Sequence, residues 1–248
     1  MKRSSDGTFT EYEGVERETT GIPGLDQMME GGYPAGGLIT LTGRPGTGKT
    51  IFSSQFLYDG CKNFGEPGMY VSMIEGKKAY LSNARRLGLD LESMEKKGLF
   101  RFLEMPTTTA DGLSSVLAEI VKWVAHDKTK RLVIDSFTAM AHTFTSRGDM
   151  RIFTHTLLGK IVAAQGCTTI MISELSPANI GFTDGIEEFI ADGVITFTLE
   201  PVSGDGRVRY IEIVKMRGTN QWMGPIPVEI SGNGMVVKHP YLRAKPRD

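Results

Sequence analysis

Short apolar segments alternate with amphipathic segments along the first three quarters of the chain. The apolar segments predict strands at 38–42, 69–74, 99–104, 132–135 and 168–173. Apolar residues at helical spacing predict helices at 49–63, 77–88, 111–125 and 150–165, and a short helix at 24–30 lies between two turn-rich segments. Because strands and helices alternate, the pattern indicates a parallel sheet with helices on both faces.

The pattern changes after residue 193. Strands are predicted at 194–199, 207–214, 227–230 and 235–238, joined by glycine-rich turns. The predicted fold class is therefore α/β, with a mainly parallel central sheet and a C-terminal antiparallel extension. The absence of repeats and linkers predicts one domain over 18–240, between tails at 1–17 and 241–248. The first tail is expected to be mobile or to order on a partner.

A glycine-rich loop follows the first strong strand. Residues Gly43–Thr50 match the P-loop pattern G-x-x-x-x-G-K-[ST], in which backbone N–H groups at a helix N-terminus bind phosphate. Lys49 is expected to reach the β- and γ-phosphates, and the Thr50 hydroxyl to hold Mg²⁺. The alternative is a chance turn, which the preceding strand and the following helix disfavour. The predicted cofactor-binding residues here are Gly46, Thr47, Gly48, Lys49, Thr50 and Ile51.

Carboxylates stand at the ends of three predicted core strands. Asp135 is the expected Mg²⁺ partner of a Walker B strand, although an isolated Asp there is more often a strand end or a helix cap. Hydrolysis also needs a group that orients or deprotonates water. Glu75 is the first candidate, because ligands bind at the carboxyl ends of parallel strands. Glu174 is the second candidate, and Ser173 is a candidate sensor of the γ-phosphate; all three would otherwise be plain strand-end residues.

Composition disfavours several other classes of function. The net charge of −1 gives no general attraction to nucleic acid or to anionic membranes. Cys61 and Cys167 have no ligand-like spacing and are expected to be buried thiols in a reducing cytosol. The four histidines are scattered and form no metal cluster. No apolar run is long enough to span a bilayer and no signal peptide precedes the fold, so we expect a cytoplasmic protein.

Taken together, the motifs resemble the KaiC-type ATPases of the RecA superfamily. The resemblance runs from about residue 19 to 237 and depends on the order and spacing of several short blocks. Besides the P-loop, these blocks are Thr20–Asp26, Gly31–Pro34, Phe56–Tyr58, Asn83–Arg85, Ile134–Ser136, Gly185–Asp192 and Lys215–Thr219.

The resemblance implies a RecA-like three-layer fold and a homo-oligomeric ring, usually a hexamer, with ATP and Mg²⁺ at subunit interfaces. It implies that Lys215 and Arg217 reach the neighbour's ATP, where Arg217 would stabilise charge on the γ-phosphate. From the residues alone, alternate positions on a strand place both cations on one face, which also suits a solvated strand edge. The further nucleotide contacts implied are Arg86, Lys215, Met216, Arg217, Thr219 and Gln221.

One position departs from the family pattern. The family usually has two adjacent glutamates after the second core strand, whereas this chain reads Ile74-Glu75. Ile74 occupies the place usually credited to the general base, and losing general-base catalysis typically slows a reaction by ~10²–10⁴-fold. We therefore expect a slow regulatory or assembly ATPase with an unidentified protein partner, or an ATP-stabilised scaffold without turnover. The predicted catalytic residues are Lys49, Glu75, Asp135 and Arg217.

Two other classes of function compete with this hypothesis. A recombination-type ATPase like RecA or RadA would hold DNA on the loops at 139–150 and 174–188. The first loop offers Arg147 and the second has no lysine or arginine, so DNA binding, which needs clustered cations, is not favoured. A small-molecule kinase needs arginines that converge on both substrates, and the antiparallel extension argues against it. The single domain, where the cyanobacterial clock protein has two, predicts no clock function.

Overall fold

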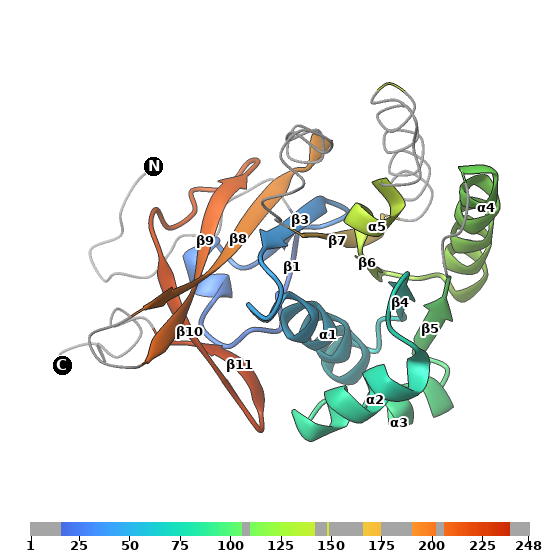
Figure 1. The fold of residues 1–248 in the computed structure, drawn as a ribbon, viewed down its shortest axis with the longest axis horizontal. Helices are drawn as coiled ribbons and strands as arrows, with labels where there is room; N and C mark the ends of the chain where they lie inside the picture. The colour runs from blue at the N-terminus through green and yellow to red at the C-terminus, as the bar shows by residue number, and fades with distance from the viewer. Residues whose placement is uncertain are drawn as a thin grey trace.

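A central sheet with helices packed against both of its faces forms the body of the molecule (Figure 1). The computed structural model describes residues 16–105, 110–141, 148, 166–174, 190–201 and 206–238. The helix predicted at 150–165 and most of the two loops considered for DNA binding lie outside these residues.

The strands are β1 (Arg17–Glu18), β2 (Tyr33–Pro34), β3 (Leu38–Gly43), β4 (Gly68–Ser72), β5 (Phe100–Glu104), β6 (Arg131–Asp135), β7 (Thr168–Glu174), β8 (Gly193–Pro201), β9 (Arg207–Met216), β10 (Ile226–Ser231) and β11 (Gly234–Val237). The strands from β3 onward agree closely with the predicted runs, whereas the two short strands β1 and β2 were not predicted. The helices are η1 (Asp26–Met28), α1 (Lys49–Asp59), η2 (Gly60–Phe64), α2 (Lys77–Arg86), α3 (Leu91–Lys96), α4 (Ala110–Asp127) and α5 (Phe137–Ala141).

The large sheet has the strand order β11-β10-β9-β8-β3-β7-β6-β4-β5. All neighbours from β8 to β5 pair in parallel, and β9, β10 and β11 continue the sheet as an antiparallel extension. β8, which the sequence analysis grouped with the extension, pairs in parallel with β3 from Ile39↔Gly193 to Gly43↔Phe197. Its first half is buried like the core strands, so β8 belongs to both parts of the sheet.

Local chemistry sets the helix ends. The predicted helix at 49–63 is α1 followed by the wider π-helical turn η2, which stops at Gly65 in the left-handed region (φ 65°). α2 ends before Gly88, whose φ of 75° needs glycine, as predicted. α3 was not predicted; the Asp90 side chain caps it by accepting a hydrogen bond from the Ser93 N–H at 3.2 Å. The helix predicted at 24–30 is shorter, the single 3₁₀ turn η1.

Alternating strand residues divide the core into two layers. On one face of the sheet, Tyr70 and Val133 pack with apolar residues of α1, α2 and α3. On the other face, Val71 and Ile134 pack with α4, through residues such as Ile120, and with α5. The result is the three-layer α/β arrangement that was predicted, with the carboxyl ends of the parallel strands free to form a site.

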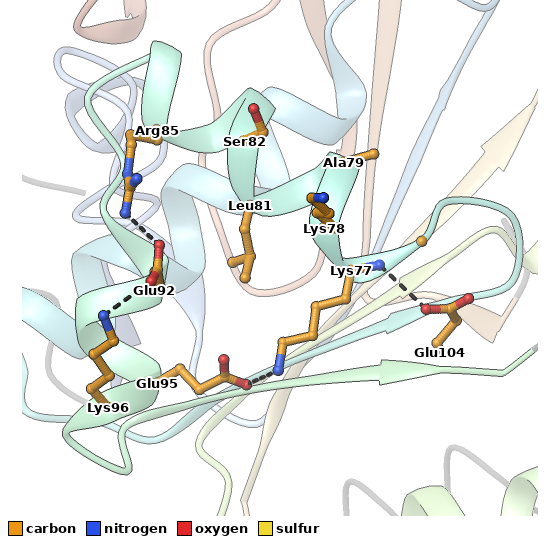
Figure 2. A pocket seen from close by; sticks show the side chains of 11 residues that line it. Lys77, Lys78, Ala79, Leu81, Ser82, Arg85, Glu92, Glu95, Lys96 and Glu104 are labelled. Atoms are coloured by element: carbon orange, nitrogen blue, oxygen red, sulfur yellow. Dashed lines mark hydrogen bonds and ion pairs between the residues drawn. The ribbon is translucent and has the colours of Figure 1, made fainter.

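A groove on the described surface lies between α2 and α3 (Figure 2). Its volume is about 1220 Å³, and its walls carry both signs of charge. Lys77 pairs with Glu95 at 2.7 Å, and Glu92 pairs with both Lys96 and Arg85. Most of its cations therefore already have a carboxylate partner. The groove thus lacks the clustered, unpaired cations that a nucleic-acid surface needs.

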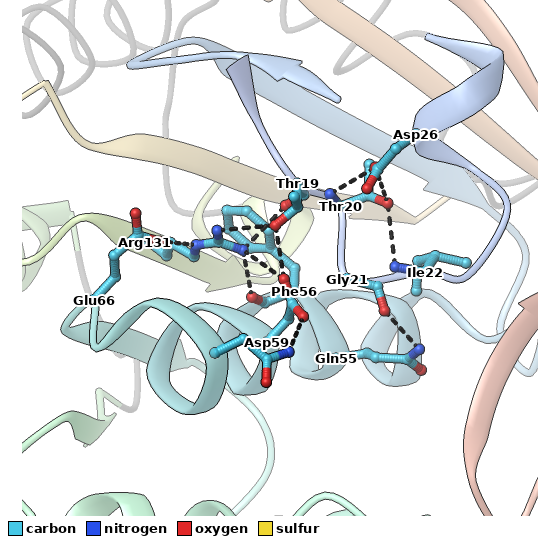
Figure 3. A network of polar contacts seen from close by, with 11 residues as sticks. Thr19, Thr20, Gly21, Ile22, Asp26, Gln55, Phe56, Asp59, Glu66 and Arg131 are labelled. Atoms are coloured by element: carbon cyan, nitrogen blue, oxygen red, sulfur yellow. Dashed lines mark hydrogen bonds and ion pairs between the residues drawn. The ribbon is translucent and has the colours of Figure 1, made fainter. Parts of the chain in front are cut away.

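The block Thr20–Asp26 attaches the N-terminal segment to helix α1 (Figure 3). Asp26 accepts hydrogen bonds from both the backbone N–H and the hydroxyl of Thr20, which closes a tight turn. Gly21 lies so close to α1 that a Cβ would come within 2.8 Å of the Gln55 carbonyl oxygen. The Gln55 side chain also donates to the Gly21 carbonyl, so this block serves packing rather than chemistry.

A fully buried arginine lies at the far end of α1 (Figure 3). Arg131, the first residue of β6, donates from Nε to Glu66 at 2.7 Å. Its Nη1 donates to the carbonyls of Thr19 and Phe56, both at 3.0 Å, and lies 3.7 Å from the Asp59 carboxylate. The guanidinium also stacks 4.7 Å from the Phe56 ring centroid. This network joins the N-terminal segment, α1, the segment after η2 and β6.

Among the described helices, none combines the length and the apolar character that crossing a membrane requires.

Candidate nucleotide site

The loop between β3 and α1 has the backbone shape that its glycines allow. Gly46 and Gly48 have φ values of 81° and 107°, in the region that other residues rarely adopt. A Cβ on Gly48 would also lie 2.9 Å from Met235 and 3.0 Å from Ile230, so the β10–β11 hairpin packs directly on the loop. Helix α1 begins directly after this loop, near the carboxyl end of β3.

Lys49 is largely buried within the loop. Its Nζ donates to the carbonyls of Gly43 at 2.8 Å and Arg44 at 3.0 Å. Burial lowers the pKa of Lys49, and the nearby carboxylates of Glu174 and Asp135 oppose that shift. An anion bound at the N-terminus of α1 would likewise favour the charged form of this lysine.

Asp135 lies at the end of β6, across from the start of α1. Its Oδ2 accepts from the Thr50 hydroxyl at 3.2 Å and from the Tyr70 phenol at 2.5 Å. Burial raises the pKa of Asp135, while these two hydrogen bonds and the charge of Lys49 act in the opposite direction. The peptide bond between Asp135 and Ser136 is cis. A hydroxyl and a carboxylate side by side supply the hard oxygen ligands that Mg²⁺ prefers, directly or through water.

A cavity of about 290 Å³ lies beside the P-loop. Gly46, Lys49 and Asp135 line it, together with Glu174 from the end of β7 and Arg209 from β9. The predicted loop, metal partner and second carboxylate candidate therefore converge in one place, as parallel strand ends do.

Glu75 lines a neighbouring cavity of about 330 Å³. This cavity shares Thr50 and Ile51 with the first one, but its other walls come from Ser54 of α1, from α2 and from the residues that follow α2. The Glu75 carboxylate accepts a hydrogen bond from the Asn83 side chain at 3.0 Å. Ile74, beside it, has 68% of its surface exposed. Of the two carboxylate candidates, Glu174 is thus the one that shares a cavity with Lys49 and Asp135.

The remaining predicted nucleotide contacts lie elsewhere in the chain. Met216 pairs with Gly193, which pairs with Ile39 at the start of β3, whereas the P-loop follows the end of β3. From Ile39 to Gly43 the strand spans about 13 Å at about 3.3 Å per residue. Lys215 and its neighbours thus lie near the amino ends of the parallel strands, whereas their own P-loop lies at the carboxyl ends.

Local contacts hold this second group in place. Lys215 donates to the carbonyl of Ala191 at 2.6 Å, and Arg217 pairs with Asp192 at 3.1 Å. Thr219 accepts a hydrogen bond from the Arg17 side chain at 2.5 Å. Among the other predicted contacts, Gln221 is half-buried and Arg86 is exposed in the last turn of α2.

The sequence analysis missed Tyr70 and Arg209. Tyr70 looks like an ordinary buried residue of an apolar strand. Its hydroxyl reaches Asp135 because of the register in which β4 pairs with β6. The alternating pattern Arg207-x-Arg209 on a predicted strand was a signal that a cation faces one side of the sheet.

Comparison with known proteins assigns the chain to a family. The family model described as KaiC ATPase matches residues 18–241. The chain belongs to the KaiC family of RecA-type ATPases. Membership of this family supports nucleotide binding and ATPase activity in general.

Proteins of archaea and bacteria match almost the whole chain. A UPF0273 protein of Pyrococcus horikoshii is 34% identical over 241 residues, covering 90% of this chain and 94% of that protein. The crystal structure of a KaiC-like protein from the same archaeon has a TM-score of 0.80 and 37% identity, covering 91% of this chain and 100% of that one. The circadian clock oscillator protein KaiC of Parathermosynechococcus lividus is 32% identical over 236 residues, which cover 92% of this chain but 43% of the clock protein.

Proposed function

We propose that the chain binds Mg-ATP at its P-loop, assembles into a ring with ATP at the subunit interfaces, and hydrolyses that ATP slowly to regulate or assemble a protein partner. The observation that carries the proposal is the convergence of Lys49, Thr50 and Asp135 on one cavity in a KaiC-family chain. Thr50 and Asp135 would hold Mg²⁺, which would neutralise charge on the phosphates.

The arrangement of cations supports a site shared between copies. Lys215 and Arg217 lie near the amino ends of the parallel strands, whereas their own P-loop lies at the carboxyl ends. In a ring, such residues act on the nucleotide of the next copy, where Arg217 would stabilise the γ-phosphate in the transition state. Arg86, Met216, Thr219 and Gln221 would complete the nucleotide contacts from the two sides of that interface.

The carboxylates support slow turnover. Ile74 cannot act as a base, and Glu75 is engaged by Asn83 in the neighbouring cavity. Glu174 lines the P-loop cavity and is the residue that we propose orients the attacking water. A DNA-associated ATPase is the second candidate, but the charged groove between α2 and α3 does not favour it, because most of its cations are already paired.

A subunit-mixing experiment tests the shared site. The wild type is expected to hydrolyse Mg-ATP and to form a larger assembly by light scattering when ATP is present. Lys49→Ala is expected to lose ATP binding, and Arg217→Ala to lose turnover while still binding ATP. Mixed in equal amounts, the two inactive variants should regain activity, because an intact P-loop from one meets an intact Arg217 from the other. Mixtures that stay inactive, although Arg217→Ala still binds ATP and assembles, would argue against the shared site.

A further inference from the structure

Arg17 is a side chain of the N-terminal segment that has no assigned role so far. It lies on β1, where it pairs with Pro34 of β2 in a small two-stranded sheet. Its side chain is 12% exposed, and Nη2 lies 3.5 Å from the Glu30 carboxylate. Its Nη1 donates to the Gly32 carbonyl at 3.4 Å. The guanidinium is thus anchored to the segment between β1 and β2.

The same guanidinium binds the turn that follows β9, near the other end of the chain. Nη2 donates to the Gly218 carbonyl at 2.9 Å, and Nη1 donates to the Thr219 hydroxyl at 2.5 Å. That hydroxyl in turn donates to the Arg217 carbonyl at 3.3 Å. Because a hydroxyl can accept one hydrogen bond while it donates another, a continuous path of hydrogen bonds leads from Arg17 to the backbone of Arg217.

The turn itself has a flexible residue at its centre. Gly218 has a φ of 65°, a conformation that glycine adopts easily but also leaves easily, since no Cβ restricts its backbone. On one side of the turn, Asp192 accepts hydrogen bonds from Arg217, at 2.8 Å from the backbone N–H to its carbonyl and at 3.1 Å from the guanidinium to its carboxylate. On the other side, Arg17 binds the two residues after Arg217. The orientation of Arg217 therefore depends on both contacts.

We propose that Arg17 is a positioning residue, which fixes the turn at 217–219 so that Arg217 is presented to the nucleotide of the next copy. This inference rests on the proposed function, because it requires that Arg217 acts across a subunit interface. In this role Arg17 acts through Arg217 and needs no contact with the nucleotide. Since a displacement of about 1 Å at a catalytic group can slow a reaction by about 10²-fold, loss of this support should lower the rate of turnover.

The N-terminal segment also offers a purely structural route from Arg17 to the site. Two residues after β1, Thr20 begins the block that packs on α1, and α1 starts at the P-loop. By this route, loss of Arg17 would damage the P-loop of its own copy, as Lys49→Ala does. By the proposed route, it would damage the site on the neighbouring copy, as Arg217→Ala does. The two routes therefore give opposite results when subunits are mixed.

Mixing R17Q with each of the two inactive variants separates these routes. Alone, R17Q is expected to assemble with ATP, with kcat lowered about 10- to 100-fold and the KM for ATP within about threefold of the wild type. In an equal mixture with K49A, activity should rise above the sum of the two variants, because K49A subunits present an intact Arg217 to the P-loops of R17Q subunits. In an equal mixture with R217A it should not rise, because neither variant presents that arginine correctly.

R101Q is the matched control for the loss of a partly buried arginine. Arg101 pairs with Asp127 and stacks 3.7 Å from the Trp123 ring centroid, on the edge strand β5. R101Q should therefore leave turnover unchanged. If R17Q does not fold, R17K takes its place in the same mixtures; it keeps the charge but lacks the planar fork that binds Gly218 and Thr219 together, so the same pattern is expected with a smaller loss.

The mixture of K49A with R217A distinguishes failure of this inference from failure of the proposed function. If these two variants restore each other, the role of Arg17 alone is overturned by wild-type turnover in R17Q or by an equal loss in R101Q. Recovery of R17Q with R217A, or with neither variant, overturns it as well. If K49A and R217A do not restore each other, the shared site is wrong, and the inference fails with it.

Discussion

Strand β6 has a charged residue at each end, and the two ends differ in where their partners come from. At its start, Arg131 is fully buried, and its partners are carboxylates, carbonyls and an aromatic ring of the same chain. At its end, Asp135 has two hydroxyl partners and faces a cavity. A charge that the chain itself satisfies stabilises the fold, whereas a charge with remaining binding capacity beside a cavity is available for a ligand.

The largest expected effect, on the free energy of unfolding, comes from removing the buried charge of Arg131 at the start of β6. Arg131→Met should lower the free energy of unfolding by about 3–5 kcal/mol, because it leaves Glu66, Asp59 and two carbonyls without their buried donor. Denaturant unfolding measures this loss. The matched control Lys96→Met removes an exposed pair with Glu92 and should change stability by less than about 1 kcal/mol. Equal midpoints for the two variants would show that the buried network contributes nothing.

The next effect concerns the functional end and the choice between two carboxylates. Glu174→Gln should lower ATP turnover by about 10²-fold while ATP binding is kept, because the group that orients water is lost. Glu75→Gln removes a carboxylate of the neighbouring cavity and should have a much smaller effect. Steady-state turnover and equilibrium binding, measured side by side, decide between them. A larger loss of turnover in Glu75→Gln would reverse the assignment.

A smaller effect, on the Mg²⁺ requirement, is expected when Asp135 loses one of its two hydroxyl partners. Tyr70→Phe should raise the Mg²⁺ concentration needed for half-maximal activity about tenfold, because groups that orient a metal ligand typically contribute 10- to 100-fold in affinity. Tyr80→Phe is the matched control, since the Tyr80 hydroxyl is also buried but donates to Ser54 at 2.9 Å. If both variants shift the Mg²⁺ requirement alike, the Tyr70 hydroxyl has no special role at the carboxylate.

The smallest effect is expected at the cysteines. Burial raises the pKa of Cys61 to about 11 and that of Cys167 to about 12. At pH 8 only a small fraction of either thiol is the reactive thiolate, and this fraction rises about tenfold per pH unit below the pKa. A thiol reagent should therefore react slowly with the folded protein at pH 8 and quickly after unfolding. Rapid labelling of the folded chain would contradict the burial of both thiols.

The sequence predicted those features that depend on a regular apolar pattern or on a short motif. The apolar runs located the strands, and the P-loop pattern located the site, because both depend on local spacing. Tyr70 and Arg209 were missed because their roles depend on which strands are neighbours and in which register. The same limit applies to Glu75, which follows β4, and to Glu174, which ends β7, because spacing along the sequence does not show which cavity each carboxylate lines.

The contact between the β10–β11 hairpin and the P-loop has a consequence for synthesis of the chain. Ile230 and Met235 pack on Gly48, and the Gln55 side chain binds the backbone of Met235 on both its N–H and its carbonyl. One wall of the phosphate-binding loop is therefore the last strand of the sheet to be translated. A nascent chain on the ribosome has the P-loop residues early, but this wall of the pocket forms only after the much later strand β11 has emerged.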